Sequence, residues 1–355
     1  MRLPLLVCAI LVAQPLAADP IRFTDHEDRE VTLPAPAQRI ASIPIPMAST
    51  LIAIDGATDR LVGMNPTAKS AIMEGILGRI FPQAREIPSD ITAPNFIPNV
   101  EELASVSPDL VIQWAGRGPD YIDPITNAGL TLMTIRYGSE VLTREYMTMA
   151  ASAMGRPERI APLIEWRAQV QADMEARTAG LADEDRPSVL YLLRAMDSLR
   201  ASGTEDNYNA WYHYLAGGRN AAEDMVGGWA DINVEQVAAW NPDVIFLNSF
   251  EADLTLDRIL NDPILSLTNA AQSGRVYKMP LGGYRWDPPN QESPLTWMWT
   301  ANLLHPDLFD YDLRAEMRTA YQVLYGHELT DADIDEILWM DMQGGQANYA
   351  QFAAP

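Results

Sequence analysis

One short segment of the chain occurs twice. The first copy, NVEELASVSPDLVI, spans residues 99–112, and the second, NVEQVAAWNPDVIF, spans residues 233–246. In each copy an Asn precedes a short helix-forming stretch, a Pro follows that stretch, and an Asp leads into a run of apolar residues. This order predicts a short helix that feeds a buried strand. Because the unit occurs twice, we expect two lobes that each contain it once.

The ends of the two predicted helices follow from polar residues at matching positions. Asn99 and Asn233 are expected to be helix N-caps, with Glu102 and Gln236 as capping-box partners three residues later. The Pro after each stretch prevents the helix from continuing. The local sequence therefore accounts for where each helix begins and ends.

Each copy also has an acid at the second helical position, Glu101 or Glu235. An acid in the first turn of a helix interacts favourably with the helix dipole by about 0.3–1 kcal/mol. That effect explains an acid at each site. It explains less well why the whole segment recurs in the two halves of the chain.

The rest of the chain also predicts two α/β lobes. A length of 355 residues suits two cores of roughly 100–150 residues each. Strand and helix patterns alternate before residue 142 and again after residue 185, which favours parallel sheets covered by helices. Between them, residues 143–184 contain apolar positions at helical spacing, with Pro157 in a first turn. We therefore predict a lobe at 19–142, a connecting long helix within 143–184, and a lobe with C-terminal helices at 185–355.

Residues 1–18 are predicted to be a secretory signal peptide that is removed. Arg2 precedes an apolar run at residues 3–12, and the small residues Ala17 and Ala18 follow. The apolar run is too short for a permanent membrane span. Cys8 is the only cysteine, so the mature chain is expected to lack disulfides and thiolate chemistry. These features predict an exported protein.

Charge and motif content argue against several classes of function. The net charge of −23 disfavours nucleic acids and anionic membrane surfaces as partners. The chain has neither a Gly-x-Ser-x-Gly elbow nor a His-Glu-x-x-His motif. We therefore expect no catalytic residues, no resident cofactor and no directly bound metal. An exported hydrolase remains the alternative from a different class.

Several segments together resemble a known family. They are REVTLPAPAQRIASI, ATDRLVGM, the two copies of the duplicated segment, AGGRNAAED, GRVYKMP and ESPLTWMWTANLLHPDLFDYDL. In this order they resemble the periplasmic substrate-binding proteins of ABC importers for iron–siderophore complexes, cobalamin and related chelates. The resemblance implies two Rossmann-like lobes joined by a single long α-helix, with a ligand cleft between the lobes. One departure is Ser49-Thr50, where the family often has Thr-Glu.

The same resemblance implies a role for the duplicated acids. In this family one surface Glu on each lobe meets Arg residues on the two permease subunits, and those acids match Glu101 and Glu235. The expected partners are a permease dimer in the inner membrane and a small metal chelate, and the protein is expected to be a monomer. No nucleic acid is expected.

Candidate ligand-binding residues follow the predicted strands, because open α/β sheets bind ligands beyond the carboxyl ends of their strands. These candidates are Asn65, Trp114, Arg117, Arg136, Tyr137, Arg194, Tyr208, Trp211, Tyr284, Arg285 and Trp286. Asn248 and Phe250 follow another predicted strand. Arginines pair with oxyanions, and aromatic faces cover a flat or apolar chelate. A ferric siderophore is therefore the expected ligand, with molybdate or tungstate, haem and cobalamin as alternatives.

Overall fold

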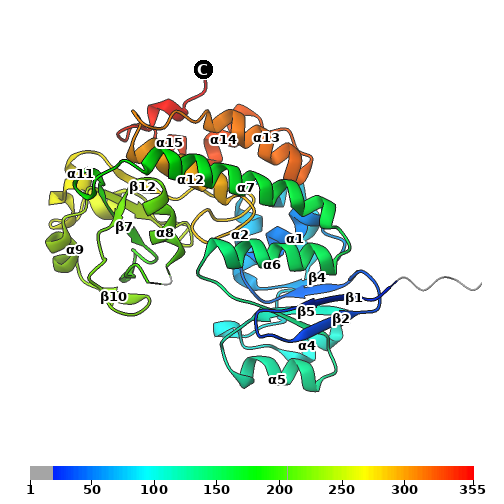
Figure 1. Ribbon diagram of the computed structural model, residues 1–355. Coiled ribbons are helices and arrows are strands. Elements are labelled where there is room, and N and C mark those ends of the chain that lie inside the picture. Colours follow the sequence, from blue (N-terminus) through cyan, green and yellow to red (C-terminus); the bar gives the residue numbers. More distant parts are fainter. Residues whose placement is uncertain (1–18, 206) are drawn as a thin grey trace, which may run out of the picture.

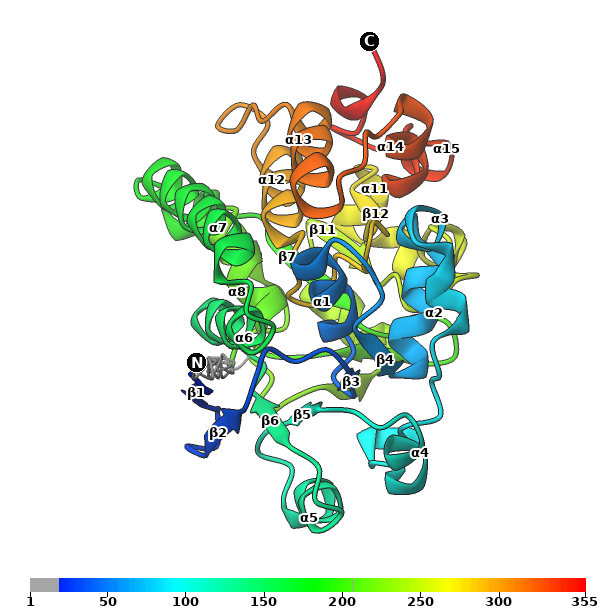
Figure 2. The same ribbon diagram turned by 90° about the vertical axis from the view of Figure 1, so that its right-hand side faces the viewer.

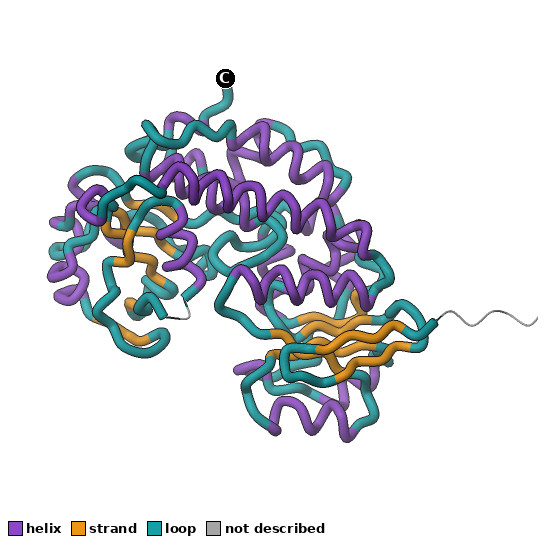
Figure 3. Tube along the Cα trace, viewed as in Figure 1, coloured by secondary structure: helices purple, strands orange, loops and turns teal. Residues whose placement is uncertain are grey.

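The computed structural model of the protein describes residues 19–205 and 207–355, so the predicted signal peptide lies outside the described residues. Two α/β lobes lie below one long helix, α7 (Pro157–Thr178), as Figure 1 shows. Figure 3 shows the strands of each lobe covered by helices. The α/β fold class is confirmed. None of the helices in the described residues is long and apolar enough to span a membrane.

The first lobe contains a parallel sheet with the strand order β4-β3-β5-β6. Its strands are β1 (Ile21–Thr24), β2 (Glu30–Leu33), β3 (Ile40–Ser42), β4 (Leu61–Met64), β5 (Leu110–Trp114) and β6 (Leu132–Ile135). Its helices are α1 (Met47–Asp55), α2 (Pro66–Glu74), α3 (Leu77–Ile80), α4 (Val100–Ser105), α5 (Pro119–Asn127) and α6 (Glu140–Ala153). Strands β1 and β2 form an antiparallel hairpin before the sheet.

The second lobe contains a parallel sheet with the order β12-β11-β7-β9. Its strands are β7 (Ser188–Leu192), β8 (Leu199–Ala201), β9 (Arg219–Asn220), β10 (Ala230–Ile232), β11 (Val244–Leu247) and β12 (Val276–Lys278). Its helices are α8 (Tyr208–Leu215), α9 (Val234–Trp240), α10 (Asp257–Leu260) and α11 (Asn269–Gln272). Strands β8 and β10 pair separately as an antiparallel ribbon.

The duplicated segment occupies the same place in both sheets. Its copies form α4 with β5 and α9 with β11. In each lobe the strand from the duplicated segment pairs with the first strand of the sheet, β3 or β7. On the other side of that first strand lies β4 in the first lobe and β9 in the second. The repeat therefore marks a shared topology, as predicted.

The Asp of each copy has the same structural role, because it accepts hydrogen bonds from the start of the neighbouring strand. Asp109 accepts backbone hydrogen bonds from Gln38 (2.7 Å) and Arg39 (3.0 Å), just before β3 begins. Asp243 accepts hydrogen bonds from the backbone N–H (2.9 Å) and the hydroxyl (2.8 Å) of Ser188, where β7 begins. Each acid thus ties the start of the first strand of its lobe to the strand that pairs with it.

The helix caps follow the prediction in the second copy only. The side chain of Asn233 accepts a hydrogen bond from the backbone of Gln236 (2.8 Å). The prediction was wrong for Asn99, which makes no side-chain cap. Its amide instead donates to the carbonyl of Asp90 (3.1 Å), so a tertiary contact has replaced the local one. Neither copy completes a capping box within the described residues.

Helix α7 begins at Pro157, as the sequence predicted, and joins the lobes through a buried ion pair. Arg167 lies on the inner face of α7 with 0% exposure and donates to both carboxylate oxygens of Glu140 on α6, at 2.8 and 2.6 Å. The second lobe completes the network: Tyr208 donates to Glu140 (3.0 Å), and the carbonyl of Asn290 accepts from Arg167 (2.6 Å). The pair therefore contacts both lobes at once.

Helices near the C-terminus pack against the second lobe and α7. They are α12 (Ser293–Leu304), α13 (Leu313–Tyr325), α14 (Asp331–Ile337) and α15 (Met340–Gln343), gathered at the end that carries the C-terminus in Figure 2. Every residue of α12 is buried, including Trp297, Met298 and Trp299. Packing of these three residues in the core was predicted from their helical spacing and is confirmed.

Candidate functional site

The predicted ligand-binding residues follow the strands of both sheets. In the first lobe Trp114 ends β5, and Arg136 and Tyr137 follow β6. In the second lobe Arg194 follows β7, and the segment that contains Arg285 follows β12. We call these positions the strand-end residues. Ligands of open α/β sheets bind beyond the carboxyl ends of the strands.

Two strand-end arginines converge on one aromatic ring in the second lobe. The guanidinium carbons of Arg194 and Arg285 lie 5.4 and 5.3 Å from the centroid of Phe250. Both distances are within the range of a cation–π interaction. Arg194 is exposed, whereas Arg285 is only 2% exposed. Two guanidinium groups of an acidic protein therefore lie beside the same aromatic ring, and groups of this kind can pair with an anion.

Arg285 also contacts the first lobe. Its Nη2 donates to Oε2 of Glu74 at 2.8 Å, and its Nη1 donates to the carbonyl of Ser249. Glu74 is the last residue of α2, so this ion pair crosses between the lobes. Next to it, Gly75 lies so close to the carbonyl of Gly282 that a Cβ at residue 75 would clash with that oxygen. The lobes are in direct contact here.

Tyr137 of the first lobe lies beside a group of buried residues from the second. The residue is 37% exposed overall, yet its hydroxyl lies in buried surroundings. Burial raises the pKa of Tyr137 well above its usual range, and the nearby Tyr146 and Asp287 raise it further. Tyr137 in turn adds to the raised pKa of Tyr191 on β7. These groups from both lobes are therefore neighbours.

Asp287 is the centre of this group and is 1% exposed. Its Oδ1 accepts hydrogen bonds from the hydroxyl of Tyr191 (2.7 Å) and the backbone of Ser249 (3.0 Å), and its Oδ2 accepts from the Ser249 hydroxyl. Burial raises the pKa of Asp287 more than these hydrogen bonds lower it. Asp287 is thus a buried acid that donors of the second lobe hold in place.

Three predicted residues keep buried donor atoms without a partner in the described part of the chain. They are Nε1 of Trp114, the hydroxyl of Tyr284 and Nε of Arg285. A buried donor that is left unpaired costs about 1–3 kcal/mol. Most buried donors in native proteins therefore have a partner. Eight other buried side-chain atoms elsewhere in the described residues also lack a hydrogen-bond partner. The three named here differ in that they lie on strand-end residues, where a ligand rich in oxygen acceptors can bond to them.

The segment that contains Tyr284 and Arg285 is held by a buried carboxylate. Glu292 accepts hydrogen bonds from the backbone of Gly283 (3.0 Å) and Nε1 of Trp286 (2.8 Å). The hydroxyls of Tyr321 (3.1 Å) and Tyr325 (2.5 Å) on α13 donate to it as well. A Cβ at Gly283 would overlap with Glu292 and Tyr325. This close packing fixes the path of the chain that leads to Arg285.

Other predicted residues have contacts that stabilise the fold. Asn65 caps α2 by accepting from the backbone of Thr67 (2.8 Å). Tyr208 donates to Glu140, and Trp211 packs against Tyr208 at 5.2 Å between ring centroids. Trp286 donates to Glu292, which holds the segment around Arg285. These contacts give each residue a structural role, and a role in binding stays a prediction.

Two predicted arginines lie on exposed parts of the first lobe. The guanidinium of Arg117 lies 4.7 Å from the ring centroid of Phe96. Arg136 is exposed, and its backbone N–H donates to Nδ1 of His26 (2.8 Å). Both side chains are accessible to a ligand or to a partner protein.

Sequence reasoning missed Glu74, Asp287 and Trp229 near these residues. Trp229 packs edge-to-face against Tyr191 at 5.7 Å. Asp287 directly follows the predicted Trp286, and an acid beside an expected anion gave no signal for a binding role. Glu74 ends a helix, and its contact with Arg285 spans 211 residues of sequence. Only the folded structure brings it to the site.

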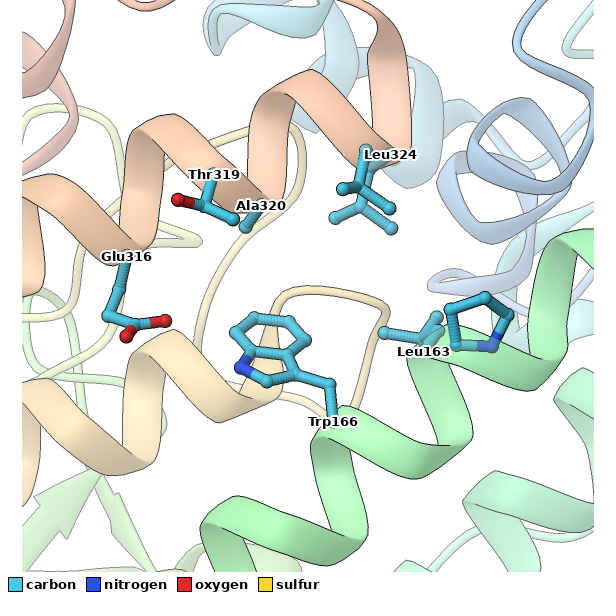
Figure 4. Close-up of a pocket in the computed structure, with 8 residues that line it drawn as sticks. Leu163, Trp166, Glu316, Thr319, Ala320 and Leu324 are labelled. Atoms are coloured by element: carbon cyan, nitrogen blue, oxygen red, sulfur yellow. The ribbon is translucent and has the colours of Figure 1, made fainter.

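A separate apolar pocket of about 220 Å³ lies between α7 and α13 (Figure 4). It is lined by Pro162, Leu163, Trp166, Glu316, Thr319, Ala320, Val323 and Leu324. Figure 4 shows Trp166 directed from α7 toward α13, which carries Glu316. Burial, with a smaller contribution from Asp312, raises the pKa of Glu316. The pocket contains an acid and no basic residue, so it does not suit an anion.

The remaining predicted roles concern docking and metals. Glu101 and Glu235 are both exposed at the second position of α4 and α9, one on each lobe. Such side chains are free to meet a partner, and their docking role stays a prediction. Within residues 19–205 and 207–355, no group of three or more His, Cys, Asp or Glu side chains is arranged to hold a metal ion.

A family model described as periplasmic binding protein matches residues 92–281. The chain belongs to this family. The structure of a periplasmic solute binding protein from Veillonella parvula is similar, with a TM-score of 0.83 and 31% identity, over 92% of this chain and 99% of that chain. The predicted membership is thus confirmed, and the members of this family are solute-binding proteins of ABC importers rather than enzymes.

Two characterised relatives of this periplasmic binding protein bind different solutes. The molybdate-binding protein MolA of Haemophilus influenzae is 26% identical, over 90% of this chain and 95% of MolA. The Fe(3+)-citrate-binding protein YfmC of Bacillus subtilis is 24% identical, over 51% of this chain and 56% of YfmC. The family therefore fixes the class of function and leaves the solute open.

Proposed function

We propose that this protein captures an oxygen-rich anion between its two lobes in the periplasm and delivers it to an ABC permease dimer. The three unpartnered buried donors of Trp114, Tyr284 and Arg285 carry the proposal. An oxyanion supplies the acceptors that these donors lack. The two arginines beside Phe250 supply compensating positive charge.

A compact oxyanion of the molybdate or tungstate type is the first candidate. Arg285 and Tyr284 are 2% and 0% exposed, so their donors serve a ligand small enough to be enclosed. The match to a molybdate-binding protein over nearly the full length of both chains supports this choice.

A ferric siderophore is the second candidate, supported by exposed strand-end residues. Tyr137 is 37% exposed, and Arg136 and Arg194 are exposed on opposite lobes. Aromatic and guanidinium groups of this kind can cover a larger anionic chelate. The partial match to a ferric citrate-binding protein agrees with it. With either ligand the protein needs no resident cofactor, because binding and release involve no chemical step.

Titration of the purified, ligand-free protein distinguishes these candidates. Sodium molybdate, sodium tungstate, ferric citrate and a catecholate ferric siderophore are each titrated while calorimetry and tryptophan fluorescence are recorded. We expect saturable binding of molybdate or tungstate at micromolar concentration or below. Binding of a ferric siderophore alone would favour the second candidate, and no binding of any of the four would contradict the proposal.

The variant Tyr284→Phe tests whether the unpartnered hydroxyl of Tyr284 binds the ligand. Loss of one hydrogen bond to a charged ligand costs about 1.5–3 kcal/mol, so affinity is expected to fall about 10- to 150-fold. The stability of the ligand-free protein should not fall, because this hydroxyl has no partner to lose among the described residues. Tyr214→Phe is the matched control, since Tyr214 is 58% exposed on α8. Unchanged affinity in Tyr284→Phe would remove that hydroxyl from the site.

A further inference from the structure

We infer that the carboxylate of Glu74 acts as an internal competitor for the ligand: it holds Arg285 in the ligand-free protein and is displaced when the anion binds. This inference rests on the proposed function and assigns a specificity-determining role to Glu74. A ligand is then captured only if it can replace a carboxylate at a buried guanidinium. Neutral compounds cannot do so.

The geometry of the ion pair shows which partner is fixed. Arg285 is 2% exposed and is held from several directions by the Ser249 carbonyl, the Phe250 ring and the packed chain around it. The Glu74 side chain is 38% exposed and belongs to the last residue of α2. The Arg285 side chain therefore has little freedom to leave the pair, whereas that of Glu74 can rotate into solvent.

Glu74 also has an alternative contact on its own helix. The hydroxyl of Ser70, one turn earlier on α2, donates to Oε1 of Glu74, whereas Arg285 binds Oε2. When an anion takes the place of Oε2 at Arg285, the hydrogen bond from Ser70 can remain. Displacement thus does not leave the carboxylate without a donor.

A second arginine explains why an anion can displace the Glu74 carboxylate from Arg285. The guanidinium of Arg194 lies 5.4 Å from the Phe250 ring centroid, donates to the Leu193 carbonyl and forms no ion pair with any described residue. Glu74 neutralises only one of the two guanidinium groups. A ligand with several charged oxygens can interact with both, and a single carboxylate at the end of α2 does not.

A different role for Glu74 predicts the opposite result. If the carboxylate only orients Arg285, its removal will loosen the guanidinium and weaken binding. If the ion pair only holds the lobes together, another interlobe ion pair should behave in the same way. Arg79 on α3 and Glu336 on α14 form such a pair at 2.6 Å, with side chains 50% and 53% exposed. Glu336 is therefore a suitable control.

The test compares wild type, Glu74→Gln and Glu336→Gln by calorimetric titration with sodium molybdate and with ferric citrate. Glu74→Gln removes the charge and keeps the size of the side chain. We expect it to bind its anion about 3- to 10-fold more tightly, at most about 1.4 kcal/mol, because the displaced carboxylate is partly screened by solvent. Glu336→Gln should stay within about twofold of wild type. Thermal unfolding verifies that each variant is folded, and Glu74→Ala provides a second variant.

Each outcome decides the inference. Tighter binding in the Glu74 variants alone supports displacement, including the case in which wild type fails to bind and Glu74→Gln binds. Equal or weaker binding in Glu74→Gln overturns the inference while leaving the proposed function intact, provided that wild type binds. Parallel changes in Glu74→Gln and Glu336→Gln also overturn it, because they point to lobe closure. If neither wild type nor the Glu74 variants bind either probe, both this inference and the proposed function fail.

Discussion

The two lobes share one strand order and differ in the loops at the carboxyl ends of their strands. In the first lobe the loops after β5 and β6 place Arg117, Arg136 and Tyr137 at the surface. In the second lobe all residues from 281 to 290 are buried beneath helices near the C-terminus. The first lobe therefore contributes most of the exposed candidates, together with the buried Trp114, and the second contributes the buried Tyr284 and Arg285, together with the exposed Arg194. The repeat thus sets the topology of both sheets, whereas the non-repeated loops carry the residues proposed to bind the ligand.

The largest loss of stability is expected from a substitution in the buried ion pair that contacts both lobes. Glu140→Gln leaves Arg167 buried without its counter-ion, which typically costs about 3–5 kcal/mol of unfolding free energy. Urea unfolding measures this loss. Glu175→Gln on the exposed face of α7 is the control and should change stability by less than about 0.5 kcal/mol. An equally small loss in Glu140→Gln would show that the buried pair does not couple the lobes.

The same variant has a defined pH dependence. Burial raises the pKa of Glu140, but Arg167 and Arg144 together lower it more, so the folded pKa lies below its ordinary value of 4.5. The stabilisation is therefore present above pH 4.5 and is lost as the pH falls through the folded pKa. The difference between wild type and Glu140→Gln should shrink in acid. A difference that does not change with pH would contradict this account.

The next largest effect is expected from Gly283→Ala in the second lobe, which we compare with Gly116→Ala in the first lobe. Gly283→Ala places a methyl group against Glu292 and Tyr325, and overpacking of this kind costs about 1–3 kcal/mol. We also expect it to abolish ligand binding, because it shifts the segment that carries Arg285. Gly116→Ala has open space but a φ of +74°, so it should cost about 1–2 kcal/mol and leave binding nearly unchanged. If Gly283→Ala and Gly116→Ala weaken ligand binding equally, the two loops do not differ in their contribution to binding, which would contradict the account.

A smaller loss of stability is expected from substitution of Asp109 and Asp243, the two aspartates of the duplicated segment. Asp243→Asn is expected to cost about 1–2 kcal/mol, because it weakens hydrogen bonds to a charged, half-buried acceptor. Asp109→Asn should cost about 0.5–1 kcal/mol, because Asp109 is exposed. Burial raises the pKa of Asp243, but hydrogen bonds from Ser188 and Asn269 lower it by more, so the folded pKa lies below its ordinary value. Its advantage should thus be present above its ordinary pKa of 3.8 and disappear in more acidic solution. Equal losses in chemical unfolding would mean that the repeat stabilises both lobes alike.

The smallest effect on the protein itself is expected from the two exposed acids. Glu101→Ala with Glu235→Ala should leave ligand affinity unchanged and lower the free energy of unfolding by no more than the helix-dipole contribution of about 0.3–1 kcal/mol per acid, because both side chains are in solvent. Exposed ion pairs with a permease are worth about 0.2–1 kcal/mol each, so solute uptake by cells should fall most in the double variant. Glu102→Ala with Gln236→Ala is the matched control on the same helices. Normal uptake by the first double variant would exclude the docking role.

Local patterns predicted the fold well because they recur in the chain. The duplicated segment indicated α4 with β5 and α9 with β11, and Pro157 indicated the start of α7. The cap at Asn99 was wrong because its amide binds the carbonyl of Asp90, a contact that local sequence does not reveal. Arg167 was missed because a charged residue on the buried stripe of a helix has no apolar signal.

The site was predictable only in part. Trp114, Tyr284 and Arg285 could be named as candidates because they lie at or after strand ends, which are visible in the sequence, and their role in binding stays a prediction. Glu74 and Asp287 were not found, because their importance comes from contacts across the lobes and from burial. Residues that follow a strand can thus be proposed from sequence, whereas the groups that tune them require the fold.

A crystal structure of the protein with molybdate tests the central claim most directly, because anomalous scattering locates molybdenum independently of the protein atoms. We expect one strong peak between the lobes, with its oxygens within hydrogen-bond distance of the Tyr284 hydroxyl and the Arg285 guanidinium, and with Glu74 moved away from Arg285. Iron anomalous scattering gives the same test for a ferric chelate. Peaks found only at the α7–α13 pocket or on the outer surface would contradict the account.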